Sequence, residues 1–150
     1  MPSAPLLRRL RELPEFEVAD RDPDPRGWPV RGADGRQFGT VHELIVDPQA
    51  LQVRYLDVEL DASFKRQESE RHILLPIGVA ALDADADNVF VPALDHERVL
   101  RYPPYAELQI TREYEQAMLR ALNLPVPPET DFYGQPAHDA AAFYRGRRAG

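Results

Sequence analysis

Three aspartates at alternate positions come closest to a metal-binding motif in this chain. Asp83, Asp85 and Asp87 have the spacing that opens a calcium-binding EF-hand loop. That loop needs glycine at its sixth position and a bidentate glutamate at its twelfth, whereas this chain has Asn88 and Leu94 there. The pattern therefore favours an acidic surface turn over a calcium site.

The histidines and hydroxyl groups give no stronger indication of chemistry. No two histidines have the i, i+4 spacing with which a helix presents two ligands to zinc. Thr40 and His42 share one face of an expected strand, which is thin evidence for an activated nucleophile. We predict no metal ion and no cofactor. The four histidines, expected to be structural or exposed, are His42, His72, His96 and His138.

Other catalytic motifs are missing from the sequence. The chain has no cysteine, which excludes a thiol nucleophile and every cysteine-based metal site. Gly32, Gly35 and Gly39 lack the lysine and the helix that a phosphate-binding loop requires, so they suit turns instead. The 25 acidic residues are too many for spacing to single out a catalytic pair. We therefore expect a protein that is not an enzyme.

A formal net charge of -7 restricts the partners of this chain. An acidic surface repels phosphate backbones, so we predict no nucleic-acid partner. Arg145, Arg147 and Arg148 form a local basic group that we interpret as a solvated tail. The longest near-apolar run, residues 73–82, is interrupted by proline and glycine and is too short to span a membrane. Together with the lack of cysteine, this fits a cytoplasmic protein.

Strands must position most of these residues. The stretch from Trp28 to Val91 alternates short apolar runs with turns, which is typical of a small β-barrel or sandwich. Asp34-Gly35 predicts a hairpin turn because both residues tolerate a positive φ. The apolar positions of residues 51–60 change phase after Tyr55, which predicts a bulge or a sharp bend. We expect a core of Val30, Val41, Leu44, Val46, Val53, Leu56, Val58, Ile73, Leu75, Val79 and Val91.

Helical patterns lie at the two ends of the chain. Leucines on one face predict a short amphipathic helix within residues 1–15. Apolar residues at helical spacing after Thr111, a suitable N-cap, predict a helix at 111–123 that packs on the barrel. The expected parts are an N-terminal helix and linker at 1–19, a domain at 20–123 and an extended or disordered tail at 124–150.

The order and spacing of several motifs resemble the PRC-barrel family over residues 20–122. The closest version is the cytoplasmic domain of the H subunit of the purple bacterial photosynthetic reaction centre. Stand-alone bacterial members also exist, and some are linked to stress responses. The motifs are Asp24-Pro25-Arg26-Gly27-Trp28-Pro29-Val30, Ala33-Asp34-Gly35, Gly39-Thr40-Val41, Leu44-Ile45-Val46-Asp47, Arg54-Tyr55-Leu56-Asp57-Val58-Glu59-Leu60, Ile73-Leu74-Leu75-Pro76-Ile77-Gly78, Val89-Phe90-Val91-Pro92-Ala93-Leu94 and Gln109-Ile110-Thr111-Arg112-Glu113.

The resemblance implies a mainly β fold: a small, strongly bent PRC-type β-barrel with a C-terminal helix and irregular tails. It also implies a module that docks on other proteins, so we predict a protein partner or a second copy of the chain. Asp47 matches an acid near the proton-carrying region of the H subunit. Ala50 stands where that region has a glutamate, so no proton relay is predicted.

Interaction anchors are sought among aromatic residues, because interface hot spots favour tryptophan and tyrosine. Trp28 is also a candidate core residue, since it begins the first strand. Two alternatives stay open: a ligand pocket at the barrel, and an electron-transfer accessory protein similar to the reaction-centre H subunit. The candidate interaction residues are Trp28, Asp47, Tyr102, Tyr105, Phe132, Tyr133, Phe143 and Tyr144.

Overall fold

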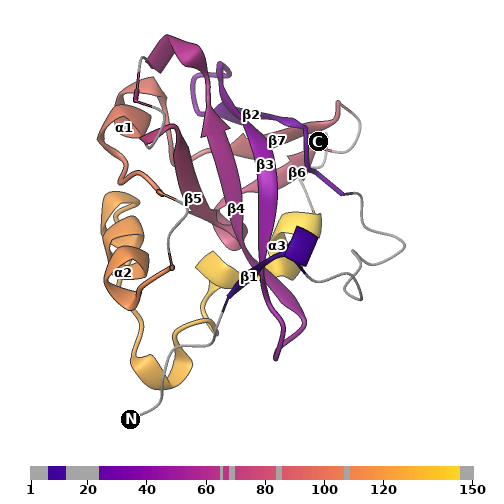
Figure 1. Cartoon of the computed structure of the whole chain (residues 1–150), viewed down its shortest axis with the longest axis vertical. Helices are drawn as coiled ribbons and strands as arrows, with labels where there is room; N and C mark the ends of the chain where they lie inside the picture. The colour runs from indigo at the N-terminus through magenta and orange to yellow at the C-terminus, as the bar shows by residue number, and fades with distance from the viewer. Residues whose placement is uncertain are drawn as a thin grey trace.

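The computed structural model describes residues 7–12, 24–64, 66–67, 70–83, 86–106 and 109–145 (Figure 1). Strands dominate its first two thirds and helical turns its last third. The strands are β1 (Arg8–Arg9), β2 (Pro29–Gly32), β3 (Gln37–Asp47), β4 (Gln52–Leu60), β5 (His72–Pro76), β6 (Ala81–Asp83) and β7 (Asn88–Val91). The helices are α1 (His96–Arg101), α2 (Arg112–Ala121) and α3 (Ala140–Arg145), with 3-10 turns at Leu10–Glu12, Ala62–Phe64, Ile77–Val79, Glu129–Asp131 and Pro136–His138.

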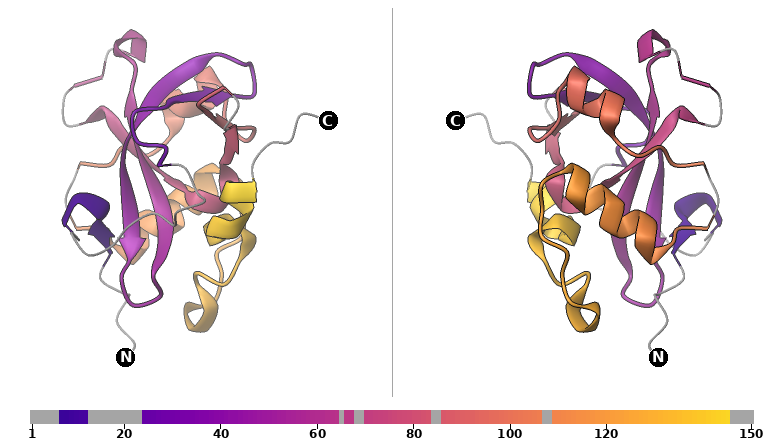
Figure 2. Two further views of the ribbon diagram at one scale, coloured as in Figure 1. Left: turned by 90° about the vertical axis from the view of Figure 1, so that its right-hand side faces the viewer. Right: turned by 90° about the vertical axis from the view of Figure 1, so that its left-hand side faces the viewer.

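The seven described strands form one bent sheet in the order β5-β4-β3-β2-β7-β6, and β1 pairs separately with β3. The pairing of β2 with β7 is parallel and the other pairings are antiparallel. The sheet curls so that β2 and β7 arch over from the β3–β4 hairpin, but it stays open between β5 and β6 (Figure 2). The prediction of a mainly β, strongly bent, barrel-like fold with a C-terminal helix is confirmed.

Two bulges bend the long β3–β4 hairpin. Register passes from the pair Val41 and Val58 directly to Glu43 and Asp57, so His42 is an extra residue of β3. A second shift leaves Arg54 as an extra residue of β4. This bulge lies where the sequence changes phase, and the predicted irregularity is confirmed. An extra residue lets a strand turn its next apolar side chains back to the core face.

The inner faces of the strands are filled with aliphatic side chains. Every predicted core residue is buried except Val79, which is half-buried. Leu94 and Val99 from the α1 region, and Met118 from α2, complete this core. A ligand inside the barrel would have to displace these side chains.

The N-terminal prediction is wrong over the residues that the structure describes. Instead of a helix, Arg8 and Arg9 form the strand β1, and a single 3-10 turn follows. They pair with Val46 and Ile45, whereas β2 pairs only with the first part of β3. The free edge of β3 supplies hydrogen-bond partners that outweigh the helical pattern of an isolated short segment. The remaining residues of the expected helix lie outside the described ranges.

The C-terminal helix agrees with the sequence, but the tail does not. Thr111 caps α2 by accepting a hydrogen bond from the backbone N–H of Tyr114 at 3.1 Å. Beyond α2, residues expected to be extended or disordered form two 3-10 turns and the helix α3. This part of the tail is ordered because Phe132, His138 and Phe143 are buried against the domain. We call residues 129–145 the C-terminal segment.

Candidate functional site

Two aromatic residues proposed as exposed anchors are buried. Tyr102 donates a hydrogen bond to the backbone carbonyl of Leu74 at 2.6 Å, and burial raises the pKa of its hydroxyl. The backbone N–H of Tyr105 donates to the carbonyl of His72 at 2.7 Å, along the outer edge of β5. Both residues therefore cover an otherwise open sheet edge. Trp28 is half-buried against the core.

The tail aromatics dock on their own domain. Phe132 and Phe143 are buried, while Tyr133 and Tyr144 are half-buried. The two buried rings are unavailable as anchors for another molecule while the C-terminal segment is docked. The sequence could not distinguish packing on the chain's own domain from contact with another molecule, because an aromatic pair next to glycine is compatible with both.

Asp47 shapes the turn between β3 and β4. Its Oδ1 accepts hydrogen bonds from the backbone N–H groups of Gln49, at 3.0 Å, and Ala50, at 3.2 Å. Its Oδ2 lies 4.0 Å from Nε of Arg54. Asp47 is itself buried, so its side chain fixes the turn and is not exposed for direct contact with another molecule.

The turn carries an uncharged and exposed surface, which we call the hairpin tip (residues 48–52). In Figure 1 the β3–β4 hairpin extends below the other sheet strands. Leu51 is 67% exposed, more than the other exposed large hydrophobic residues, Leu100 and Val126. Its φ of 54° lies in the left-handed region that non-glycine residues rarely adopt. The hairpin tip thus combines exposure, apolar character and backbone strain.

Glu115 lies at the centre of a buried polar network between α2, β4 and the C-terminal segment. Its Oε2 accepts hydrogen bonds from the hydroxyls of Tyr55, at 2.6 Å, and Tyr133, at 2.5 Å. Its Oε1 accepts one from Nη1 of Arg112 at 3.0 Å. Burial raises the pKa of the Glu115 carboxyl, although these tyrosines and the arginine act in the opposite direction.

His138 joins the C-terminal segment to this network. Its Nε2 lies 2.9 Å from the hydroxyl oxygen of Tyr55. The hydroxyl proton of Tyr55 is donated to Glu115, so Nε2 of His138 carries the proton of this contact. Nη1 of Arg54 donates to the backbone carbonyl of His138 at 3.1 Å. We call Tyr55, Arg112, Glu115, Tyr133 and His138 the Glu115 network.

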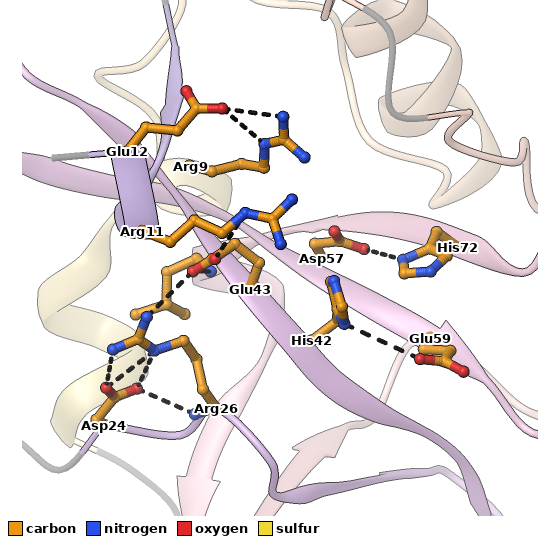
Figure 3. A network of polar contacts seen from close by, with 11 residues as sticks. Arg9, Arg11, Glu12, Asp24, Arg26, His42, Glu43, Asp57, Glu59 and His72 are labelled. Carbon is orange, nitrogen blue, oxygen red and sulfur yellow. Dashed lines mark hydrogen bonds and ion pairs between the residues drawn. The ribbon is translucent and has the colours of Figure 1, made fainter.

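A second group of polar residues lies on β3, β4 and β5 (Figure 3). Asp57 is fully buried, and its Oδ1 lies 2.7 Å from Nδ1 of His72. The His42 ring meets the His72 ring edge-on at 4.9 Å, and Nδ1 of His42 lies 3.9 Å from Glu59. Glu43 is the cross-strand neighbour of Asp57. We call these five residues the Asp57 cluster.

Arginines from outside the sheet approach Glu43. Oε1 of Glu43 accepts from the backbone N–H of Leu44 at 3.0 Å and lies 3.4 Å from Arg26. Oε2 lies 3.8 Å from Arg11. Burial acts to raise the pKa of Asp24, but its hydrogen bonds and ion pair with Arg26 prevail and lower it. Exposed cations therefore balance the carboxylates of this region.

The two groups define what the described side chains can do chemically. The pair Asp57 and His72 is an arrangement that orients an imidazole ring. Within the described ranges, however, histidine and acidic side chains form no group of three or more that could hold a metal ion. No helix in those ranges has both the length and the apolar character that crossing a membrane requires.

Sequence reasoning missed Glu115, Asp57 and the burial of His138. A signal was present for Glu115, which precedes the buried Met118 by three residues and Leu119 by four. A glutamate on the apolar stripe of a helix indicates a buried carboxylate with partners. For Asp57 and His138 the partners are distant in sequence, and no local pattern indicates them.

A bent open sheet with helices docked on it defines a small β module. Comparison with known protein families matches residues 17–97, more than half of the chain, to the PRC-barrel domain. The chain therefore belongs to the PRC-barrel domain family. In general terms, this membership suggests a protein-interaction or assembly module.

Proposed function

We propose that this chain is a non-enzymatic protein-interaction or assembly module whose contact surface is the hairpin tip. The observation that carries the proposal is Leu51, an exposed leucine held in a strained backbone conformation. Such strain costs on the order of 1 to 3 kcal/mol and persists where the surrounding structure imposes it. Here the buried carboxylate of Asp47 imposes the turn.

The composition of the hairpin tip supports a protein partner. The sequence Pro-Gln-Ala-Leu-Gln has no charge, although 29% of the chain is charged. Protein interfaces are depleted of charged residues at their centres, and a surface without arginine or lysine offers nothing to phosphate. We propose a cytoplasmic partner with an apolar recess, and a second copy of this chain is the first partner to test. A role in stress responses would act through this contact.

Light scattering of the full chain over a wide concentration range tests self-association. Leu51→Asp places a charge at the proposed contact, so we expect it to lower the solution mass of any oligomer. Leu100→Asp is the matched control, because Leu100 is an exposed leucine on α1, and α1 lies at the opposite end of the molecule from the β3–β4 hairpin (Figure 1). An oligomer that survives Leu51→Asp would exclude the hairpin tip as the self-association surface.

Site-specific photo-crosslinking tests a foreign partner. A photoreactive residue at Gln49 should form a defined protein adduct that Leu51→Asp abolishes. The control position is Gln37, an exposed glutamine at the other end of β3. If the chain is monomeric and Gln49 gives the same adducts as Gln37, the hairpin tip is not a binding surface.

A further inference from the structure

His138 is enclosed by groups from every element that packs against it. It is fully buried, and its ring contacts those of Tyr55, Phe132 and Tyr133, with centroids 5.0 to 5.6 Å away. The charged and titratable groups facing this site are Arg54 and Tyr55 of β4, Arg112 and Glu115 of α2, and Tyr133 of the C-terminal segment.

The two ring nitrogens of His138 have different environments. Nε2 donates to the hydroxyl oxygen of Tyr55, which in turn donates to Glu115. Nδ1 is buried and has no hydrogen-bond partner among the described residues. A proton added to Nδ1 would create a buried donor without an acceptor, and the charge of the imidazolium would lie near two arginines.

We propose that the C-terminal segment is a pH-sensitive latch that docks on β4, β6, α2 and the 3-10 turn Ile77–Val79 when His138 is neutral and is released when His138 is protonated. The released histidine would be solvated and free to accept the proton, whereas the docked histidine is not. The proposal goes beyond the binding surface at the hairpin tip, which it does not require.

The C-terminal segment is joined to α2 by a short connection and docks on the domain through close contacts. Residues 125–128 include three prolines and connect α2 to the C-terminal segment. Beside His138, a Cβ on Gly78 would lie 1.8 Å from the carbonyl oxygen of Pro136, so the turn Pro136–His138 docks through direct backbone contact. Both the contact at Gly78 and the hydrogen bond to Tyr55 would be lost together if the C-terminal segment moved away.

The pKa values give the sign and the size of the effect. Burial lowers the pKa of His138 to about 4, with Arg54 and Arg112 acting in the same direction. A histidine in the released segment has a pKa of about 6.5. Docking is therefore favoured above pH 6.5 and is lost as the pH falls towards 4. These two values weaken the docking equilibrium about 20-fold between pH 7 and pH 5.

Glu115 acts in the opposite direction. Burial raises the pKa of its carboxyl, so protonation of Glu115 at acidic pH favours the docked state. A loss of docking on acidification must therefore come from His138 and not from Glu115. His138→Gln separates the two, because its amide keeps a donor near the position of Nε2 but does not titrate.

Hydrogen–deuterium exchange of the full chain at pH 7 and pH 5, corrected for intrinsic exchange rates, measures the latch. We expect the protection of α3 to fall by at most about 20-fold, since Glu115 opposes part of the His138 effect, while that of β3 and β4 is unchanged. In His138→Gln the protection of α3 should not fall. Equal protection of wild-type α3 at both pH values, an equal fall in His138→Gln, or a parallel loss in β3 and β4 would each overturn the proposal.

An NMR titration of the wild-type imidazoles provides a second test that does not depend on the variant folding. The His138 resonance should titrate well below the ordinary histidine pKa of about 6.5 while α3 remains docked. A His138 pKa at or above the ordinary value of about 6.5 would contradict the latch.

Discussion

The Glu115 network and the Asp57 cluster each contain a buried carboxylate, but the two carboxylates are satisfied differently. Glu115 receives three donors, which come from β4, α2 and the C-terminal segment. Asp57 has one partner, His72 on the adjacent strand, and its Oδ2 has none among the described residues. One carboxylate therefore connects elements that are distant in sequence, and the other sits within a single sheet.

The difference indicates where ionised groups stabilise this fold. When a buried carboxylate has several donors, removing its charge or one of the donors lowers the stability of the fold strongly, because the remaining groups stay buried without partners. A carboxylate next to another acid gains less from its charge, since like charges on opposed strand positions repel. Glu43 faces Asp57 in this way.

The largest expected effect is that of Glu115→Gln. The amide replaces one acceptor oxygen with a donor, so either Arg112 or the two tyrosines would face a second donor. We expect the free energy of unfolding to fall by about 3 kcal/mol in urea denaturation. Glu113→Gln, an exposed change on the same helix, should stay within about 0.5 kcal/mol. If Glu115→Gln had the same small effect as Glu113→Gln, the three donors of Glu115 would not make it more stabilising than Asp57.

Gly78→Ala tests the docking of the C-terminal segment at the turn Pro136–His138. The new Cβ would meet the backbone of Pro136 and Ala137, which cannot rotate away. We expect a loss of about 2 kcal/mol and weaker protection of α3 from hydrogen exchange. Gly134→Ala is the control, since the three atoms nearest to its Cβ would all belong to the side chain of Asp131, which can move. A loss in Gly134→Ala as large as that in Gly78→Ala would argue against tight backbone docking.

Asp57→Asn should have a smaller effect than Glu115→Gln. The amide keeps an oxygen for His72 and places its NH₂ group at the position of the unpartnered Oδ2. It also removes the charge opposite Glu43. We expect the free energy of unfolding to change by no more than about 1 kcal/mol. A loss near that of Glu115→Gln would show that the charge of Asp57 has a partner beyond His72.

Arg26→Ala is expected to have the smallest effect. Arg26 contacts Asp24 and Glu43 from the protein surface, and Glu43 keeps its hydrogen bond from the backbone of Leu44. We expect a loss of about 0.5 kcal/mol that decreases further in high salt. Denaturation at two salt concentrations measures both quantities. A salt-independent loss above about 2 kcal/mol would show that the contacts of Arg26 with Asp24 and Glu43 stabilise the fold as strongly as a buried network does.

Local signals in the sequence determined the strands between Trp28 and Val91 and the helix α2. Asp34-Gly35 marked the β2–β3 turn, where Gly35 has a φ of 75°. Thr111 marked the start of α2, and the phase change after Tyr55 marked the bulge at Arg54. Each signal depends on a few neighbouring residues, because turn geometry, capping and strand alternation are properties of short segments.

Only the tertiary structure decided which side chains share a buried site. Tyr55 and Glu115 are 60 residues apart, and His138 lies 83 residues from Tyr55. Arg8 and Arg9 became a strand because the edge of β3 was free. The C-terminal segment became ordered because its aromatic residues found a surface on β4, β6, α2 and the 3-10 turn Ile77–Val79. Burial and long-range pairing depend on the whole fold, so the sequence pattern of one segment does not contain them.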